Sequence, residues 1–298
     1  MEFKPPAAPR AAGKERFMAV KITSDSTCDL TADLVAAHDI EIVPLSIVKD
    51  GRPYRDGVEI TPADIFRHVD AGGDITTTAA VSVGEYHDVF ERLSPRYEAV
   101  IHITISADFS SCFQNACIAA GDFDNVYVVD SRNLSSGHGH VVVEAALAAE
   151  AGMEVRDIVT FLNGLTPRVE ASFIIDRLDY MVKGGRCSAV TMLGANLLRL
   201  KPCIEVRDGK MGVVKKYRGS FQKCLTDYVR DRLQGRDDIE TERIFITHPD
   251  APAEAVEAVR AEISKYRSFR RVIETRAGCT VSSHCGPNTL GILFIRSK

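Results

Sequence analysis

The sequence predicts an α/β protein with two domains, and three observations lead to this prediction. Strand-like apolar segments alternate with amphipathic helical segments up to about Arg168, which is typical of a parallel sheet covered by helices. Beyond that point Asp208-Gly209 separates two strand-like runs, a strong signal for a hairpin and therefore for antiparallel pairing. The length of 298 residues is enough for two domains. We therefore expect a parallel-sheet α/β domain over residues 17–167 and a mixed α/β domain with antiparallel strands over residues 168–298.

The N-terminal domain is expected to follow an extension without a folding pattern. Residues 1–16 contain three prolines and mixed charge without hydrophobic periodicity, so we expect them to be disordered. Two helix starts are marked by their caps: Thr61 and Asp64 flank a first-turn proline, and Ser82 with Glu85 forms a capping box. The apolar patterns predict strands at 18–22, 40–48, 99–106 and 125–131, and helices at 31–38, 112–120 and 141–152.

The C-terminal domain is expected to combine a hairpin with helices and further strands. The hairpin covers residues 203–217 and turns at Asp208-Gly209. The remaining patterns predict strands at 171–176, 243–248, 270–275 and 291–297, and helices at 220–233 and 252–266.

Composition and charge argue against several classes of protein. With 37 Lys and Arg against 41 Asp and Glu, the formal net charge is -4, so nucleic acid is not expected as a partner. No apolar run approaches the roughly 20 residues of a membrane-spanning helix, and the N-terminus lacks the apolar core of a signal peptide. We therefore expect a cytoplasmic protein.

The eight cysteines show no metal-binding spacing. They form no Cys-x-x-Cys pair and no pattern with paired histidines, so we expect neither a metal site nor a resident cofactor. In a chain that is not secreted, such thiols are usually buried as small apolar side chains. We also expect no disulfides.

Candidate binding residues lie in turns next to the predicted strands and helices. Asp25, Ser26 and Asp29 follow the first strand, where open parallel sheets bind ligands, although capping of the next helix is the simpler explanation. Ser110 and Ser111 stand at the start of a helix, where free N–H groups can hold an anion, and they too can be simple caps. The other candidates are the hydroxyl cluster 76–82, the loop 183–186 with two glycines and Arg186, and the turn 283–288 with His284.

In their order along the chain these segments resemble the DegV family of fatty-acid-binding proteins, the lipid-carrying subunits of bacterial fatty acid kinase. The resemblance implies a two-domain DegV-like fold, with an acyl chain in an apolar tunnel and its carboxylate near the domain junction. It spans roughly Val20 to Ile295. It rests on ITSDSTCDL, TTTAAVSVGEY, ISADFSSCFQNA, VVDSRNLSSGHGHVVVEAA, RLDYMVKGGRCS, LKPCIEVRDGKM with the following RGS, THPDAPAEA and HCGPNTLGILF.

The resemblance also implies four residues that bind the fatty acid. The threonine of the family's TSQPS-type segment corresponds to Thr78, and the first serine of its LSG segment corresponds to Ser110. The histidine of its HTGPG-type segment corresponds to His284, and the arginine of its GGRI segment corresponds to Arg186. This chain departs from the family pattern at Ala79-Ala80-Val81, at Phe109 and Ser111, and at Cys285 and Asn288.

The implied function is that of a carrier. The chain would bind a long-chain fatty acid and present it to the catalytic subunit of a fatty acid kinase, which makes acyl-phosphate for phospholipid synthesis. Because the phosphoryl transfer would belong to that partner, no catalytic residue is expected here. The basic residues within 215–218 and 270–271 are candidates for transient contact with an acidic membrane surface or with the kinase.

Two enzymatic alternatives remain open. Ser110, His284 and Asp25 include the groups of a nucleophile, a base and an orienting carboxylate, as in a serine hydrolase acting on an acyl ester. No Gly-x-Ser-x-Gly elbow surrounds Ser110, which disfavours this alternative. A nucleotide-binding enzyme is also disfavoured, because the chain has neither a Gly-x-Gly-x-x-Gly motif nor a phosphate loop, and the run 136–140 contains two glycines but not the third.

Overall fold

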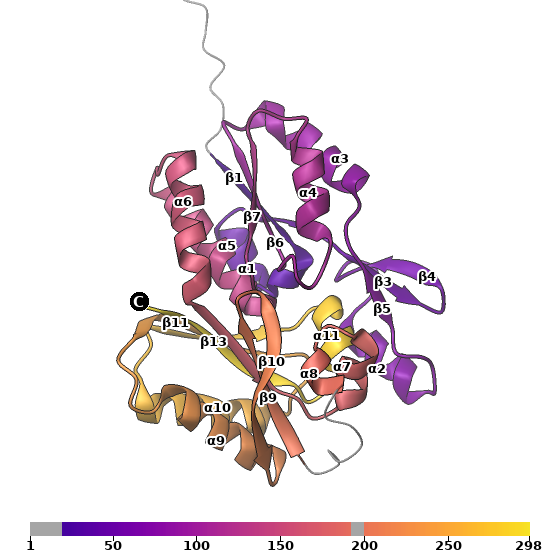
Figure 1. Ribbon diagram of the computed structural model, residues 1–298, viewed down its shortest axis with the longest axis vertical. Coiled ribbons are helices and arrows are strands. Elements are labelled where there is room, and N and C mark those ends of the chain that lie inside the picture. The colour runs from indigo at the N-terminus through magenta and orange to yellow at the C-terminus, as the bar shows by residue number, and fades with distance from the viewer. Residues whose placement is uncertain (1–19, 192–199) are drawn as a thin grey trace, which may run out of the picture.

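The computed structural model describes residues 20–191 and 200–298, and the strands of this part form three sheets (Figure 1). The extension predicted over residues 1–16 lies outside the described residues. The first strand, predicted at 18–22, is observed at Lys21–Asp25, and residues 18 and 19 lie outside the described residues. None of the described helices is long and apolar enough to cross a membrane.

The N-terminal half is built on a four-stranded sheet in which every strand pair is parallel. The strand order is β2 (Glu41–Val43), β1 (Lys21–Asp25), β6 (Val100–Thr104) and β7 (Val126–Asp130). The larger helices are α3 (Val83–Leu93), α4 (Cys112–Ala120), α5 (Ser135–Glu150) and α6 (Val155–Leu165), and the short α1 (Ala32–Ala37) follows β1. Helices α3 and α4 pack on one face of the sheet, and α5 and α6 pack on the other (Figure 1). The predicted parallel sheet is therefore confirmed.

The C-terminal half is built on a six-stranded mixed sheet. Its order is β10 (Lys210–Arg218), β9 (Leu200–Arg207), β8 (Val169–Ile174), β13 (Leu290–Arg296), β11 (Ile239–His248) and β12 (Arg271–Arg276). The pair of β11 and β12 is parallel, and the other pairs are antiparallel. Asp208 and Gly209 turn the chain from β9 to β10 with φ values of 51° and 82°, which suit a two-residue hairpin loop. The predicted hairpin and the mixed sheet are confirmed.

The alternation of side chains along the central strands gives this sheet two buried faces. Ile174, Ile292 and Phe294 pack beneath α9 (Phe221–Leu233) and α10 (Ala253–Tyr266). The neighbouring Phe173 and Leu293 belong instead to the core that includes the helices of the N-terminal half. The inner face of the mixed sheet therefore lies against the N-terminal half.

A small antiparallel sheet forms where the sequence predicted one strand over residues 40–48. Pro44 has no N–H to donate to a neighbouring strand, and the chain leaves the parallel sheet after β2. It continues as β3 (Ser46–Lys49), which pairs with β4 (Arg52–Arg55) and with β5 (Thr77–Ala79). Between β4 and β5 lies α2 (Pro62–Asp70), which has the predicted capping box.

The helices depart from the sequence-based expectation at several places. Helix α5 begins at Ser135 instead of near residue 141, and Gly139 lets it approach the first turn: a Cβ there would lie 2.5 Å from the Cys28 carbonyl oxygen. Helix α6 was not predicted. Helix α11 (Cys279–Cys285) includes the first half of the turn that was predicted at 283–288. The short α7 (Leu178–Gly184) and α8 (Ser188–Thr191) were also not predicted, and they complete the described helices.

Helix α11 connects the two halves of the molecule. Its chain neighbours β12 and β13 belong to the six-stranded sheet, but α11 packs against α2, β3 and β5. Figure 1 shows it next to α7 and the small sheet. The boundary at 167/168 stays a prediction, and β8 begins just after it at Val169.

Candidate functional site

The four residues singled out from the sequence, Thr78, Ser110, Arg186 and His284, line one cavity between the two halves. The cavity has a volume of about 50 Å³. Most of the remaining wall is apolar and includes Leu45, Ile105, Phe109, Leu134, Met211 and Val281. The structure therefore brings the four polar residues together at the edge of an apolar cavity.

These four residues come from four separate elements. Thr78 lies on β5, opposite Ile47 of β3, and Ser110 lies just before α4. Arg186 follows α7, whose C-terminus is capped by Gly185 in the left-handed conformation with φ of 66°. His284 lies in the last turn of α11. Only folding brings these positions into contact, because they span more than two thirds of the chain.

The centre of the site is a hydrogen bond between His284 and Thr78. His284 Nε2 lies 2.8 Å from Thr78 Oγ1, whereas His284 Nδ1 has no partner among the described residues. Burial, together with the positive charge of Arg186, lowers the pKa of His284 to about 4. The imidazole is therefore neutral at neutral pH. When its proton is on Nε2, the hydrogen of the Thr78 hydroxyl is free for another acceptor.

The glycine pair next to Arg186 has a steric role at this histidine. A Cβ at Gly184 would lie 2.1 Å from His284 Nδ1, so only glycine leaves room for the ring. Arg186 donates from Nη1 to the Gly184 carbonyl at 2.8 Å and makes no ion pair with any residue in the described part of the chain. Its charge is therefore not balanced by a nearby carboxylate of those residues.

Ser110 occupies the N-terminal end of α4. Its Oγ donates to Cys112 Sγ at 3.1 Å and accepts from the Cys112 N–H at 3.3 Å. The partial positive charge of a helix N-terminus is favourable for an anion at this place. Ser110 and Arg186 thus contribute two sources of positive potential to the same cavity.

Two further cavities adjoin this one. A second cavity of about 20 Å³ shares Leu134, Val281 and Cys285 with it and reaches Phe173 and Leu293 on the inner face of the mixed sheet. A third, more open cavity of about 420 Å³ shares Phe109, Arg186 and Met211 with it and includes Asp108, Ser188 and Lys210. The polar end of the site is therefore next to an open cavity, and its apolar side is next to a mostly apolar one.

The groups proposed for a serine hydrolase are not assembled. The Asp25 carboxylate accepts from Tyr86 Oη at 2.6 Å and from the Ile105 N–H at 3.0 Å, and His102 Nε2 lies 3.3 Å from it. Although burial raises the pKa of Asp25, these hydrogen bonds and the charge of His102 bring it below its usual range. Neither Asp25 nor Ser110 is hydrogen-bonded to His284, so the nucleophile and the base are not linked.

The turn after β1 has a role that the sequence did not indicate. Thr31 caps α1, whereas Asp29 accepts from the N–H of Gly278 at 2.8 Å and from Ser135 Oγ at 2.5 Å. The explanation of Asp29 as a cap of the next helix is therefore wrong. Asp56, which sequence reasoning missed, also binds the start of α11. A lone aspartate in a polar loop gives no signal of such a distant partner.

The glycines of the run 136–140 are in the interior of α5 and do not form a phosphate-binding loop. A Cβ at Gly137 would lie 2.2 Å from Asn133 Oδ1, and Gly139 packs against the first turn of the chain. Gly137 therefore makes room for the Asn133 side chain, and Gly139 permits close packing of the helix against the Cys28 backbone. The structure gives no support to the nucleotide-binding alternative at this position.

The basic residues considered for membrane contact do not form one surface. Those within 215–218 lie on β10 and those at 270–271 lie at the start of β12, and these strands are the opposite edges of the six-stranded sheet. Lys215 is paired with Asp231, and Arg270 is paired with Glu242. A single basic patch made from both groups is therefore excluded by the topology.

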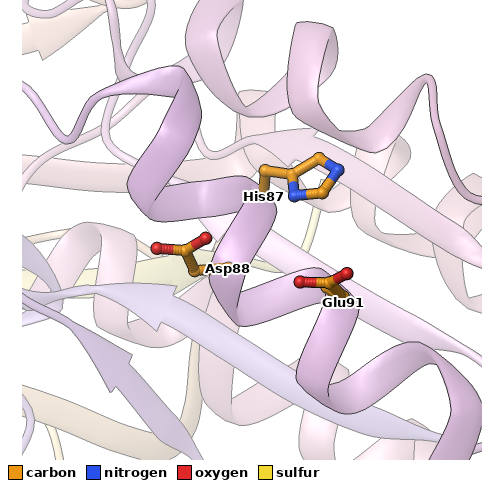
Figure 2. A group of neighbouring side chains, drawn as sticks. All are labelled: His87, Asp88 and Glu91. Carbon is orange, nitrogen blue, oxygen red and sulfur yellow. The ribbon is translucent and has the colours of Figure 1, made fainter.

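One group of side chains in the described part of the chain has the geometry of a metal-binding cluster. His87, Asp88 and Glu91 lie close together on α3 (Figure 2). All three come from the surface of one helix, and His87 Nε2 is 3.5 Å from Asp122. Exposed acidic groups are common without an ion.

The cysteines are mostly buried. Of the eight free cysteines, seven are buried, as expected for small apolar side chains, and Cys117 is exposed.

Comparison with known proteins agrees with this architecture. The family model described as "Uncharacterised protein, DegV family" matches residues 19–297. A DegV domain-containing protein of Caldanaerobacter subterraneus subsp. tengcongensis is 33% identical over 279 residues, which cover 92% of this chain and 98% of that protein.

Solved structures give the same result. A DegV family protein from Thermus thermophilus, described by its fatty acid binding, superposes with a TM-score of 0.85 at 28% identity, covering 94% of this chain and 100% of that chain. A stearic acid-binding protein from Eubacterium ventriosum superposes with a TM-score of 0.80 at 27% identity, covering 93% of this chain and 98% of that chain. This chain, with its parallel sheet, its mixed sheet and its cavity between the two halves, belongs to the DegV family.

Proposed function

We propose that this protein binds a long-chain fatty acid between its two halves and presents the carboxylate to a fatty acid kinase. The observation that carries this proposal is that Thr78, Ser110, Arg186 and His284 line one cavity whose remaining wall is mostly apolar. Relatives of the same fold are described as binding fatty acids, one of them stearic acid, which supports the same ligand class.

The polar residues suit a carboxylate. An anion taken out of water needs donors, and the hydroxyls of Thr78 and Ser110 can supply two. The guanidinium of Arg186 adds a positive charge at the same cavity. A neutral His284 does not add charge, but its Nε2–H can hold the Thr78 oxygen so that the Thr78 hydrogen faces the ligand. The head group would thus be oriented by neutral donors and one cation.

The apolar tail would supply most of the affinity. Burying about 14 methylenes at about 0.8 kcal/mol each gives roughly 11 kcal/mol before the cost of ordering is subtracted. The tail would pass Leu134, Val281 and Cys285 from the first cavity into the second. These cavities measure about 50 and 20 Å³, whereas small-molecule sites measure roughly 300–1,000 Å³. The wall between them would have to move when the tail enters.

The role of this chain would be to carry substrate, with the phosphoryl transfer performed by the kinase. A carboxylate oxygen at Thr78 and Arg186 would lie beside the open cavity with Lys210, where ATP on the kinase could approach. That oxygen would attack the γ-phosphorus, and ADP would leave. No residue of this chain is needed as the nucleophile or the base, because the carboxylate is already ionised at neutral pH.

Ligand extraction tests the binding part of this proposal. The purified protein would be measured by native mass spectrometry, then denatured and extracted, and the extract would be analysed for fatty acids. We expect close to one fatty acid per chain. A folded protein that yields no fatty acid, and whose mass and melting temperature do not change on addition of oleic acid, would contradict the proposal.

The kinase part is tested separately. The protein loaded with fatty acid would be mixed with ATP and a fatty acid kinase catalytic subunit, and hydroxylamine would trap acyl-phosphate as a hydroxamate. We expect hydroxamate only when all three components are present. Bound fatty acid without any hydroxamate would remove the kinase role but keep the binding role. Turnover of a p-nitrophenyl acyl ester that is lost in Ser110→Ala would instead favour the hydrolase.

A further inference from the structure

The first turn of α11 is held by two buried aspartate side chains from the N-terminal half. Burial raises the pKa of Asp29 to about 8, so its carboxyl group is largely protonated at neutral pH. Asp29 Oδ1 accepts from the Gly278 N–H at 2.8 Å. Asp56 Oδ1 accepts from the Cys279 N–H at 2.8 Å, and its Oδ2 accepts from the Thr280 N–H at 3.1 Å and from Thr280 Oγ1 at 2.7 Å. We call Asp29 and Asp56 the carboxylate clasp.

The carboxylate clasp is itself anchored in the N-terminal half. Ser135 Oγ, at the start of α5, donates to Asp29 Oδ2 at 2.5 Å. Ser26 Oγ donates to Asp56 Oδ2 at 3.0 Å and accepts from the Leu45 N–H at 3.2 Å. Leu45 lines the candidate fatty acid cavity. The clasp therefore links α11 to another part of the cavity wall.

Helix α11 supplies the wall that separates the two cavities. Thr280, Val281, His284 and Cys285 line the first cavity, and Val281 and Cys285 also line the second. A displacement of α11 would therefore change both cavities and move His284 with them. The segment is only seven residues long, so its position depends on its contacts with the surrounding elements, including those at its first turn.

We infer that Asp29 and Asp56 are positioning residues of the fatty acid site, which hold α11 closed over the two cavities and limit the rate at which the ligand leaves. This inference rests on the proposed function. Opening of the clasp lets α11 move away from the N-terminal half, so that the bound tail is uncovered and can leave. Closure brings Val281 and Cys285 back against the tail and returns His284 to Thr78.

The test measures dissociation and local opening in the same variants. Asp56→Asn keeps the shape of the side chain, but it replaces one acceptor oxygen by a donor that faces the N–H groups of α11. We expect the stoichiometry of cis-parinaric acid binding to be unchanged and its dissociation into excess albumin to be roughly tenfold faster. Hydrogen exchange should be accelerated in residues 278–285 and unchanged in α9 and α10.

Two comparison variants keep the test decisive. Glu85→Gln alters a carboxylate cap of α3 that makes no contact with α11, and it should leave both readouts unchanged. Ser26→Ala removes one donor to Asp56 and the acceptor of the Leu45 N–H but leaves both aspartates in place, and it should give a change in the same direction of roughly two- to threefold, even where Asp56→Asn fails to fold. Wild-type dissociation and exchange rates in Ser26→Ala and Asp56→Asn would overturn the inference. Failure of the wild-type protein to bind cis-parinaric acid or oleic acid would instead overturn the proposed function.

Discussion

The two ends of α11 contact the same half of the molecule in different ways. At its start, the N–H groups of residues 278–280 all donate to carboxyl oxygens of Asp29 and Asp56. At its end, His284 bonds to Thr78 and keeps Nδ1 without a partner among the described residues, next to an arginine that makes no ion pair with them. The comparison suggests a division of work between the two ends. The start of α11, where every N–H group named above has an acceptor, holds the helix, and we call it the saturated end. The C-terminal turn, where His284 Nδ1 has no partner among the described residues, can receive a ligand, and we call it the unsaturated end.

The largest expected effect is on the saturated end. Asp56→Ala leaves the N–H groups of Cys279 and Thr280 and the Thr280 hydroxyl without an acceptor in a buried place, and we expect a loss of about 3 kcal/mol in unfolding free energy. Urea denaturation measures it. Ser82→Ala removes an exposed helix cap and should cost about 1 kcal/mol. Equal losses in the two variants would remove the distinction between a buried clasp and an ordinary cap.

A change at the unsaturated end should affect binding more than stability. Gly184→Ala would place a Cβ only 2.1 Å from His284 Nδ1, which is far too close for two atoms that are not bonded. The imidazole ring would therefore have to move away from Thr78. We expect fatty acid affinity to fall roughly tenfold or more, as measured by titration with cis-parinaric acid. Gly164→Ala, in α6 with nothing within 4 Å of the new Cβ, is the matched control and should bind like the wild type.

Removal of one donor should have a smaller effect. Thr78→Val keeps the shape of the side chain and deletes the hydroxyl, so we expect affinity to fall about five- to tenfold with little change in melting temperature. Thr77→Val, on the neighbouring exposed position of β5, provides the control. Unchanged affinity in Thr78→Val combined with Ser110→Ala would show that the unsaturated end does not hold the carboxylate.

The two ends are also expected to differ in the pH dependence of their contributions to stability. Burial and the charge of Asp56 raise the pKa of Asp29 to about 8 from 3.8, so its contribution to stability is lost as the pH rises through this window. The pKa of His284 is lowered to about 4 from 6.5, so its contribution is lost as the pH falls through that window.

Urea denaturation as a function of pH measures this difference. Asp29→Asn should remove a slope of at most about 1.4 kcal/mol per pH unit between pH 4 and 8, and His284→Gln should remove a slope of opposite sign between pH 4 and 6.5. Slopes of the same sign would contradict the assigned protonation states. Glu85→Gln, on an exposed cap, should leave both slopes in place.

Much of the fold was predictable because its signals are local. The capping boxes at Thr61 and Ser82 and the hairpin at Asp208-Gly209 depend on neighbouring residues, and all three are present. Helix α11 was missed because its acceptors lie more than 220 residues away in sequence. The start of α5 was missed because its glycines lower local helix propensity, and only close packing of Gly137 against Asn133 and of Gly139 against Cys28 explains them.

The sequence by itself determined the α/β class, the parallel and mixed sheets, and the identity of four polar residues that converge on one cavity. These features could be predicted because hydrophobic periodicity, turn residues and the motifs of the family can each be recognised within a short segment of the sequence. Only the tertiary structure decided that Asp29 and Asp56 hold α11, that Gly184 makes room for His284, and that Asp25 is kept away from it. These facts depend on which distant groups meet in a buried place, because a buried carboxylate or N–H must find its partner wherever the packing puts one.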